Sequence, residues 1–434
     1  TQSTWGSTSH YNWHVHSQSS RQQTSTMGAK RAVIIGINYP GTKAELRGCV
    51  NDAKRMHECL VERYGFEPED ITLLIDTDPS SPQPTGKNIR AALTKLVASA
   101  SPGDLLFVHY SGHGTRLPAE SGEDDDTGYD ECIVPSDMNL ITDDDFRDFV
   151  DKVPDGCFIT IVSDSCHSGG LIDEAKEQIG ESTKNQAKGE VKTEAPSFGF
   201  RSIMNTVVNT ALESRELNLG YNRRRPVEHE QVKDLPGGKA HIKSRSLPLS
   251  TLMEVLQQKT GKQDLDIGKL RMALYEAFGD DSSPKVKKFM DVILGHFQDG
   301  KGKAGIGGLV GSLAQGFLQM SMEQGGGGSA KPAAKAQKQA AHGGASGRPM
   351  PDNGILISGC QSDQTSADAT PSGNPSGAYG ALSNAIQTLL SESRGPVTNK
   401  DLVLGVRKML QKQGFTQRPG LYCSDEIADS SFVC

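Results

Sequence analysis

The chain has 434 residues and a formal net charge of −7, which is enough length for two or three domains of ordinary size. The acidic balance disfavours nonspecific binding to nucleic acid and suits a basic substrate or a metal cation. The eight cysteines are dispersed without a CxxC pair, which argues against a zinc site and a disulfide-stapled domain. We therefore expect a reducing compartment, the cytoplasm and also the nucleus. No apolar run approaches the roughly 20 residues that a membrane span needs.

Residues 1–26 differ in composition from the rest of the chain. They are rich in Ser, Thr, Gln and His and lack the apolar segment of a signal peptide. We interpret them as an expression leader or a translated upstream segment, with the natural start at Met27. A native disordered tail is the alternative.

From Lys30 onwards, short apolar runs alternate with longer amphipathic stretches. Apolar runs of this length are typical of strands buried between two layers of helices, and they lie at residues 32–37, 71–75, 105–110, 158–162 and 355–357. Helices are predicted at residues 51–64, 86–100, 143–150, 377–391 and 400–413. The alternation predicts a three-layer α/β/α sandwich around a central, mostly parallel sheet.

The alternation stops after about residue 179 and returns at residue 354. The composition between them is that of a linker, with a glycine tract at 325–328, and only residues 247–259 have a helical pattern. The last predicted strand is too short to form a core alone, so we expect one sheet that is split by a long insertion. The expected parts are a large part (27–183), a linker (184–348) and a small part (349–434) that completes the sheet.

Two predicted strands run directly into small, glycine-rich turns. One ends in His109-Tyr110-Ser111-Gly112-His113-Gly114, and the other in Asp164-Ser165-Cys166-His167-Ser168-Gly169-Gly170. Active sites of open α/β sheets lie beyond the carboxyl ends of the strands. A histidine after one strand and a cysteine after the next are therefore expected to meet.

These residues suit a cysteine protease with Cys166 as nucleophile and His113 as base. A thiol becomes a strong nucleophile as the thiolate, which a nearby imidazole promotes. The backbone N–H groups of Gly114 and Cys166 are the candidate oxyanion donors, and no third member of a triad is evident. The alternatives are a structural cysteine, a turn histidine, or a metal held by His109 and His113 or by Cys166 and His167.

The chain resembles the plant type II metacaspases, which belong with the caspase-like cysteine proteases and lack a proline-rich prodomain. The resemblance rests on both turn motifs, on the separation of about 50 residues between the histidine and the cysteine, and on three further segments: Gly36-Ile37-Asn38-Tyr39, Gly48-Cys49-Val50-Asn51-Asp52, and residues 358–368. It implies a caspase-like fold and a calcium-dependent endopeptidase, made as a zymogen that self-processes in its linker. A monomer acting on proteins or peptides in stress, wounding or programmed cell death is expected.

Two carboxylates are expected at the same end of the sheet as the nucleophile. Asp164 lies two residues before Cys166, and Asp52 follows the first strand. Both would receive the cationic group of Arg or Lys through charge-assisted hydrogen bonds, although Asp52 could instead cap the following helix. The resemblance implies that Asp52 and Asp164 form the substrate pocket, with Ser111 on its wall, and that the enzyme cleaves after Arg or Lys. The alternative functions are a noncatalytic scaffold that keeps the fold and a vacuolar Asn-specific protease.

Carboxylates are dense between residues 123 and 145. An acidic run is usually a solvated loop, but hard oxygen ligands in neighbouring loops suit Ca²⁺, which takes six to eight oxygens. The resemblance implies that calcium is bound by Asp130, Asp143, Asp144 and Asp173, with a weaker site at Asp124, Asp125 and Asp126. Calcium would order the loop after Cys166 and so switch activity on.

Basic residues flanked by apolar ones occupy residues 241–249 of the insertion. Such a segment offers a cation for the acidic pocket, and its tether gives it a high effective concentration there. The resemblance implies that Arg245 enters the pocket and that the cut falls between Arg245 and Ser246, with Lys243 as second candidate. An exposed basic linker is the alternative.

Overall fold

A computed structural model describes residues 28–118, 129–166, 177–180, 230–236, 238–261, 265, 270–298, 354–360 and 364–433. Several predictions lie outside these residues: the leader at 1–26, the boundaries at 183/184 and 348/349, and the side chains of Asp124, Asp125, Asp126, His167 and Asp173.

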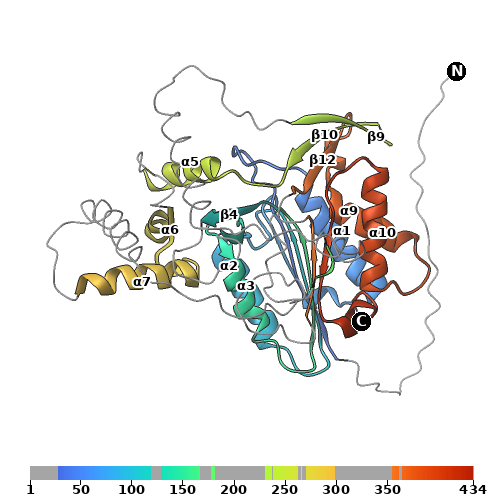
Figure 1. Ribbon diagram of the computed structural model, residues 1–434, viewed down its shortest axis with the longest axis horizontal. Coiled ribbons are helices and arrows are strands. Elements are labelled where there is room, and N and C mark those ends of the chain that lie inside the picture. The colour runs from blue at the N-terminus through green and yellow to red at the C-terminus, as the bar shows by residue number, and fades with distance from the viewer. Residues whose placement is uncertain are drawn as a thin grey trace, which may run out of the picture.

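A seven-stranded sheet in the order β2-β1-β3-β7-β11-β14-β8 forms the centre of the molecule (Figure 1). Its strands are β1 (Lys30–Gly36), β2 (Ile71–Ile75), β3 (Leu105–Ser111), β7 (Phe158–Asp164), β8 (Glu177–Ile179), β11 (Gly354–Ser358) and β14 (Gly420–Tyr422). The strands from β2 to β11 pair in parallel, whereas β14 and β8 are antiparallel. The prediction of a mostly parallel α/β sheet is confirmed, and the segment after the insertion supplies β11 and β14.

Helices cover both faces of this sheet because its strands are apolar on both sides. Val33 and Ile35 of β1 point into one core, while Ala32 and Ile34 point into the other, as the period of two in a strand requires. The first core is closed by α2 (Gly86–Ala98) and α3 (Asp143–Val150), and the second by α1 (Cys49–Tyr64), α9 (Ala381–Glu392), α10 (Asn399–Lys412) and α11 (Asp425–Ala428). The result is the predicted three-layer sandwich.

The insertion is more regular than its composition predicts. It contributes β9 (Gln231–Leu235), β10 (Gly238–Ser244), α5 (Leu249–Thr260), α6 (Leu270–Phe278) and α7 (Pro284–Gln298), of which only α5 has a clear sequence signal. Strands β10 and β9 join β12 (Ala367–Pro371) and β13 (Tyr379–Gly380) in a four-stranded sheet. A three-stranded sheet holds β4 (Gly114–Pro118), β5 (Tyr129–Ile133) and β6 (Ile141–Thr142).

Two helix starts place acidic side chains that matter below. Thr142 caps α3 in a capping box with Asp145, which fixes the entry of that helix and puts Asp143 and Asp144 in its first turn. The N-cap of α1 is Gly48, so Asp52 lies inside the first turn of the helix. The alternative role of Asp52 as an N-cap is therefore wrong.

Replacing Leu356 by Ala tests whether β11, the first strand after the insertion, is integral to the main core. Leu356 of β11 is fully buried, so its truncation should cost about 2–5 kcal/mol of unfolding free energy. Leu404→Ala is the matched control, because Leu404 is 40% exposed and a surface change should cost no more than about 0.5 kcal/mol. Urea unfolding of both variants, in an inactive Cys166→Ala chain, measures the difference, and equal midpoints would contradict the assignment.

Candidate active site

The register of the sheet brings the two sequence motifs together. Strands β3 and β7 are neighbours and pair residue by residue, so that Ser111 lies beside Asp164 at their carboxyl ends. The turn that follows each strand therefore leaves the sheet at the same edge. Gly114 packs so closely against Cys166 that a Cβ on Gly114 would lie 1.8 Å from the Cys166 carbonyl oxygen. Only glycine fits at this position.

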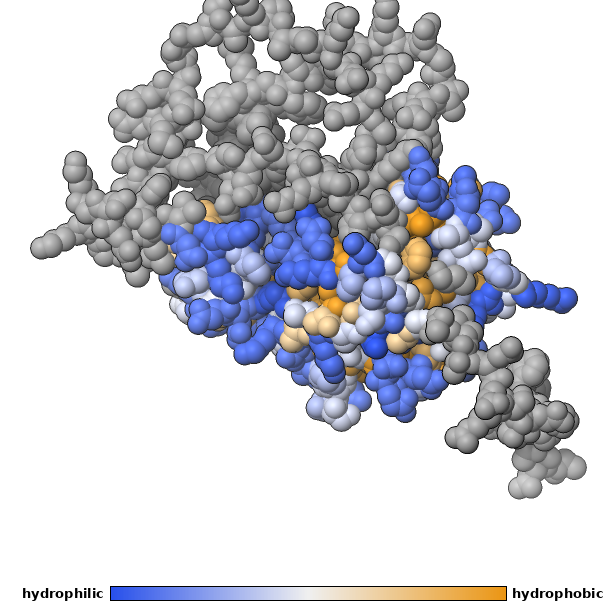
Figure 2. Space-filling view, turned by 90° about the horizontal axis from the view of Figure 1, so that it is seen from below, coloured by the Kyte–Doolittle hydropathy of each residue, from blue (hydrophilic) through white to orange (hydrophobic). Residues whose placement is uncertain are grey.

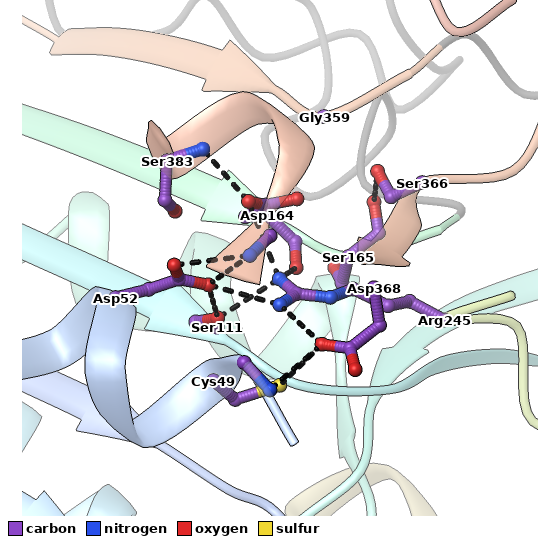
Figure 3. A network of polar contacts seen from close by, with 12 residues as sticks. Cys49, Asp52, Ser111, Asp164, Ser165, Arg245, Gly359, Ser366, Asp368 and Ser383 are labelled. Atoms are coloured by element: carbon purple, nitrogen blue, oxygen red, sulfur yellow. Dashed lines mark hydrogen bonds and ion pairs between the residues drawn. The ribbon is translucent and has the colours of Figure 1, made fainter. Parts of the chain in front are cut away.

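A buried pocket at this edge encloses the side chain of Arg245, which is 0% exposed. Figure 3 shows the guanidinium surrounded by three carboxylates and a hydroxyl. Its contacts are Nη2 with Asp52 Oδ2 at 2.9 Å and Asp368 Oδ1 at 3.0 Å, and Nη1 with Ser111 Oγ at 2.8 Å, Asp164 O at 2.9 Å and Asp164 Oδ2 at 3.2 Å. A planar, five-donor cation can satisfy this many acceptors at once.

Backbone and side-chain donors hold the pocket carboxylates in place. Gly380 N–H donates to Asp52, and Ser383 N–H donates to Asp164 Oδ2 at 2.8 Å. Burial raises the pKa of Asp52 to about 6, and the nearby Arg245 opposes this rise. The carboxylates are thus fixed in a dry site where an unpaired negative charge is costly.

Asp368 is a third pocket carboxylate that the sequence analysis does not assign. It accepts hydrogen bonds from the backbone N–H groups of Arg47 and Gly48, each at 3.0 Å. It lies on β12, which pairs with β10 of the insertion in the register Lys243–Asp368. No residue spacing signals this position, because it depends on pairing between two segments that are far apart in the sequence.

The backbone around Arg245 is extended and bound on both sides. Arg245 N–H donates to Ser366 O at 3.0 Å, and Gly114 N–H donates to Arg245 O at 2.9 Å. Beyond Arg245, Leu247 N–H donates to Gly114 O at 2.8 Å, and Thr115 Oγ1 donates to Leu247 O at 2.9 Å. The segment therefore lies in the site as an added strand, a common way for a peptide to bind.

Cys166 is buried in this arrangement. Its Sγ accepts a hydrogen bond from Ser366 N–H at 3.0 Å. The carbonyl oxygen of the same Ser366 accepts from the Arg245 backbone N–H. Burial raises the pKa of the Cys166 thiol well above its ordinary value, and the neighbouring thiol of Cys360 raises it further.

The imidazole of His113 is oriented by a backbone carbonyl. His113 Nε2 lies 2.8 Å from Ala44 O, and because a carbonyl only accepts, Nε2 carries a proton, which leaves Nδ1 as the basic nitrogen of the neutral ring. The ring also packs against Tyr39, with centroids 4.9 Å apart, and Tyr110 OH donates to His113 O at 2.6 Å. The orienting group that sequence analysis could not name is the carbonyl of Ala44, a backbone atom without a residue-type signal.

The alternative of a metal at the two histidines has no support in the described residues. His109 Nε2 contacts Ser383 Oγ at 3.0 Å, away from the Ala44 contact of His113, and burial lowers the pKa of His109 to about 3. Within the described ranges no three His, Cys, Asp or Glu side chains are grouped as metal ligands.

The predicted calcium ligands Asp130, Asp143 and Asp144 come from β5 and the start of α3, which are neighbours. Lys285 Nζ of α7 lies 2.7 Å from Asp130 Oδ1 and 2.5 Å from Asp144 Oδ2. The two carboxylates are thus paired with an ammonium group, and among the described residues they are not grouped with a third side chain as metal ligands. Although burial disfavours a charged lysine, Asp130 and Asp144 raise the pKa of Lys285.

Comparison with known proteins shows the family of this chain. The caspase domain model matches residues 29–429. The chain belongs to the caspase-domain family, and within it to the type II metacaspases. It is 60% identical to Metacaspase-4 of Arabidopsis thaliana over 418 residues, 56% identical to Metacaspase-6 over 411, and 51% identical to Metacaspase-7 over 412. These matches span 93–94% of this chain and 100% of each relative, so this metacaspase is a cysteine-type endopeptidase.

No helix in the described part of this metacaspase is long and apolar enough to cross a bilayer. In the view of Figure 2, hydrophilic residues cover much of the coloured surface, with apolar residues between them.

A Gly380→Ala substitution should expel the Arg245 side chain from its pocket. The added Cβ would lie 2.4 Å from both Arg245 Nη1 and Asp164 Oδ2, where no methyl group can fit. In a Cys166→Ala chain, the bond after Arg245 should then be cut by trypsin at least about tenfold faster, a change of roughly 1.4 kcal/mol. The matched control is Gly395→Ala, whose Cβ meets nothing within 4 Å. Equal protection of the Arg245 bond in both variants would contradict the pocket geometry.

Proposed function

We propose that this metacaspase is a calcium-dependent endopeptidase that cleaves proteins and peptides after Arg or Lys, and that it is made as a zymogen which self-processes in the insertion. The observation that carries the proposal is the pose of Arg245. Its guanidinium fills a pocket of three carboxylates, while its carbonyl oxygen accepts from Gly114 N–H at 2.9 Å. A basic residue of a substrate would enter the same pocket in the same orientation.

Catalysis would use Cys166 as nucleophile and His113 as base. His113 takes the thiol proton, Cys166 Sγ attacks the carbonyl carbon after the basic residue, and a covalent thioester forms as the amine leaves with that proton. Gly114 N–H, with Cys166 N–H as the second donor, would stabilise the oxyanion. Water then hydrolyses the thioester.

Specificity for a cation follows from the charge of the pocket. Asp52 and Asp164 are 0% exposed and Asp368 is 3% exposed. If the pocket were empty, or held an uncharged side chain, these carboxylates would be buried without a counter-charge. This disfavours the rival Asn-specific protease. Ser111 on the pocket wall donates to Asp52 Oδ2 at 2.9 Å and accepts from the guanidinium, so its role would be to orient both.

Arg245 is the proposed processing site, with the cut before Ser246. Lys243 is disfavoured as the second candidate, because its Nζ donates to Glu45 O at 2.8 Å outside the pocket. Calcium at Asp130, Asp143, Asp144 and Asp173 would supply the switch, and of these Asp130 lies on β5 and Asp143 and Asp144 lie on α3.

The proposed setting is a monomer in the cytoplasm and also the nucleus, acting in stress, wounding or programmed cell death. A reducing compartment is supported by the cysteines of the described residues, which form no disulfide. The rival of a noncatalytic scaffold is disfavoured by the intact Cys166 and His113.

Calcium addition to the purified chain tests the function directly. The expected result is two fragments, the second beginning Ser-Leu-Pro-Leu, with no cleavage in chelator or in Cys166→Ala. Arg245→Ala should slow cleavage of this bond on the order of 100-fold, the scale of losing a buried charge pair of about 3 kcal/mol. Lys243→Ala is the matched control and should be processed normally. Full processing in chelator would refute the calcium dependence. An unchanged cleavage rate for Arg245→Ala would refute Arg245 as the processing site.

A further inference from the structure

The two residues that follow the proposed cut lie against β4 of the catalytic part. Ser246 forms a parallel bridge with Gly114, and Leu247 N–H donates to Gly114 O at 2.8 Å. Thr115 Oγ1 donates to Leu247 O at 2.9 Å. Strand β4 lies at the edge of its sheet and pairs with β5 on its other side. The segment after the cut therefore occupies the edge of β4 that β5 leaves open.

The peptide passes from one sheet to another at the bond that is cut. Before the cut, Ser244 pairs with Ala367 of β12 in antiparallel orientation. After the cut, Ser246 pairs with Gly114 of β4, and β12 and β4 belong to different sheets. A peptide added to a strand edge gains affinity from main-chain hydrogen bonds and specificity from alternate side chains. A substrate in this pose would be held on both sides of the scissile bond.

The side chain of the second residue after the cut is buried among apolar residues. Leu247 is 2% exposed and belongs to the same core as Leu46 and Leu117. Its neighbours differ, because Ser246 is half-buried and Pro248 is exposed. This alternation follows from the period of two in an extended chain. Of these three positions, the second after the cut is therefore the one with an apolar environment.

The polar groups of β4 also match a peptide of at least two residues after the cut. Gly114 is buried and Thr115 is 1% exposed, and a buried hydroxyl or carbonyl without a partner costs free energy. The N–H and carbonyl groups of Leu247 satisfy the Gly114 carbonyl and the Thr115 hydroxyl. A leaving group without a second residue offers neither contact.

We propose that β4 binds the leaving side of substrates, and that Thr115 and the apolar environment of Leu247 favour proteins with an apolar residue at the second position after the cut. This inference rests on the cleavage after Arg or Lys proposed above and adds a second specificity determinant to it. The carboxylate pocket selects the residue before the cut, and β4 selects the second residue after it. Basic residues are common on protein surfaces, so the second determinant narrows the set of bonds that are cut.

Cleavage of synthetic peptides by the full chain, with calcium present, tests this selection. The parent peptide has the sequence of residues 240–250 and carries a fluorophore and a quencher. Leu247→Ala in the peptide should lower kcat/KM at least about tenfold, as expected for methylene groups lost from an apolar site. Pro248→Ala in the peptide is the matched control, because Pro248 is exposed, and it should be cleaved like the parent peptide.

Two enzyme variants test the role of the Thr115 hydroxyl. The readout is the ratio of kcat/KM for the parent peptide to kcat/KM for residues 242–245 linked to aminomethylcoumarin, which has no second residue after the cut. Thr115→Val keeps the shape but removes the donor, and it should lower this ratio about 2- to 10-fold, the scale of one neutral hydrogen bond. Thr115→Ser keeps the hydroxyl and should restore the ratio. General damage to the fold would affect both substrates and cancel.

The coumarin substrate separates failure of this inference from failure of the proposed function. Equal kcat/KM for the three peptides, or a parent-like ratio for Thr115→Val, would overturn the inference while cleavage of the coumarin substrate leaves the proposed function intact. No cleavage of the coumarin substrate by the parent enzyme would overturn both.

Discussion

The buried ion cluster around Arg245 is the interaction on which the site depends. One guanidinium meets Asp52, Asp164 and Asp368 in a pocket closed to solvent, and each partner alone would be a costly buried charge. The cluster joins the first helix, two strands and the insertion, which are far apart in the sequence. Because the same contacts place the Arg245 carbonyl at Gly114 N–H, charge recognition also sets the position of the peptide bond.

The insertion couples this cluster to a second one. Arg245 neutralises the pocket, while Arg271 and Lys285 pair with carboxylates on β5 and α3, so cations from one segment stabilise two carboxylate clusters of the catalytic part. Burial of Cys166 and the raised pKa of its thiol belong to this closed state.

Local sequence patterns predict the central sheet well because buried strands and their glycine turns have strong signals. The predicted run at residues 71–75 and the predicted helix at 143–150 coincide with β2 and α3. Strands β12 and β10 are missed, since they are stabilised by pairing with each other rather than by their own apolar pattern. Asp368 and the Ala44 carbonyl are missed for the same reason: tertiary contacts position them, and no local spacing reports such contacts.

Alkylation of Cys166 by an arginyl peptide chloromethyl ketone, without calcium, tests most directly whether Arg245 closes the catalytic centre. Labelling of the intact chain is followed by mass spectrometry for the parent, Arg245→Ala and Lys243→Ala. If Arg245 holds the segment in place, Arg245→Ala should label at least about tenfold faster than the parent, which corresponds to roughly 1.4 kcal/mol, and Lys243→Ala should label like the parent. Equal labelling rates for Arg245→Ala and the parent would contradict the account.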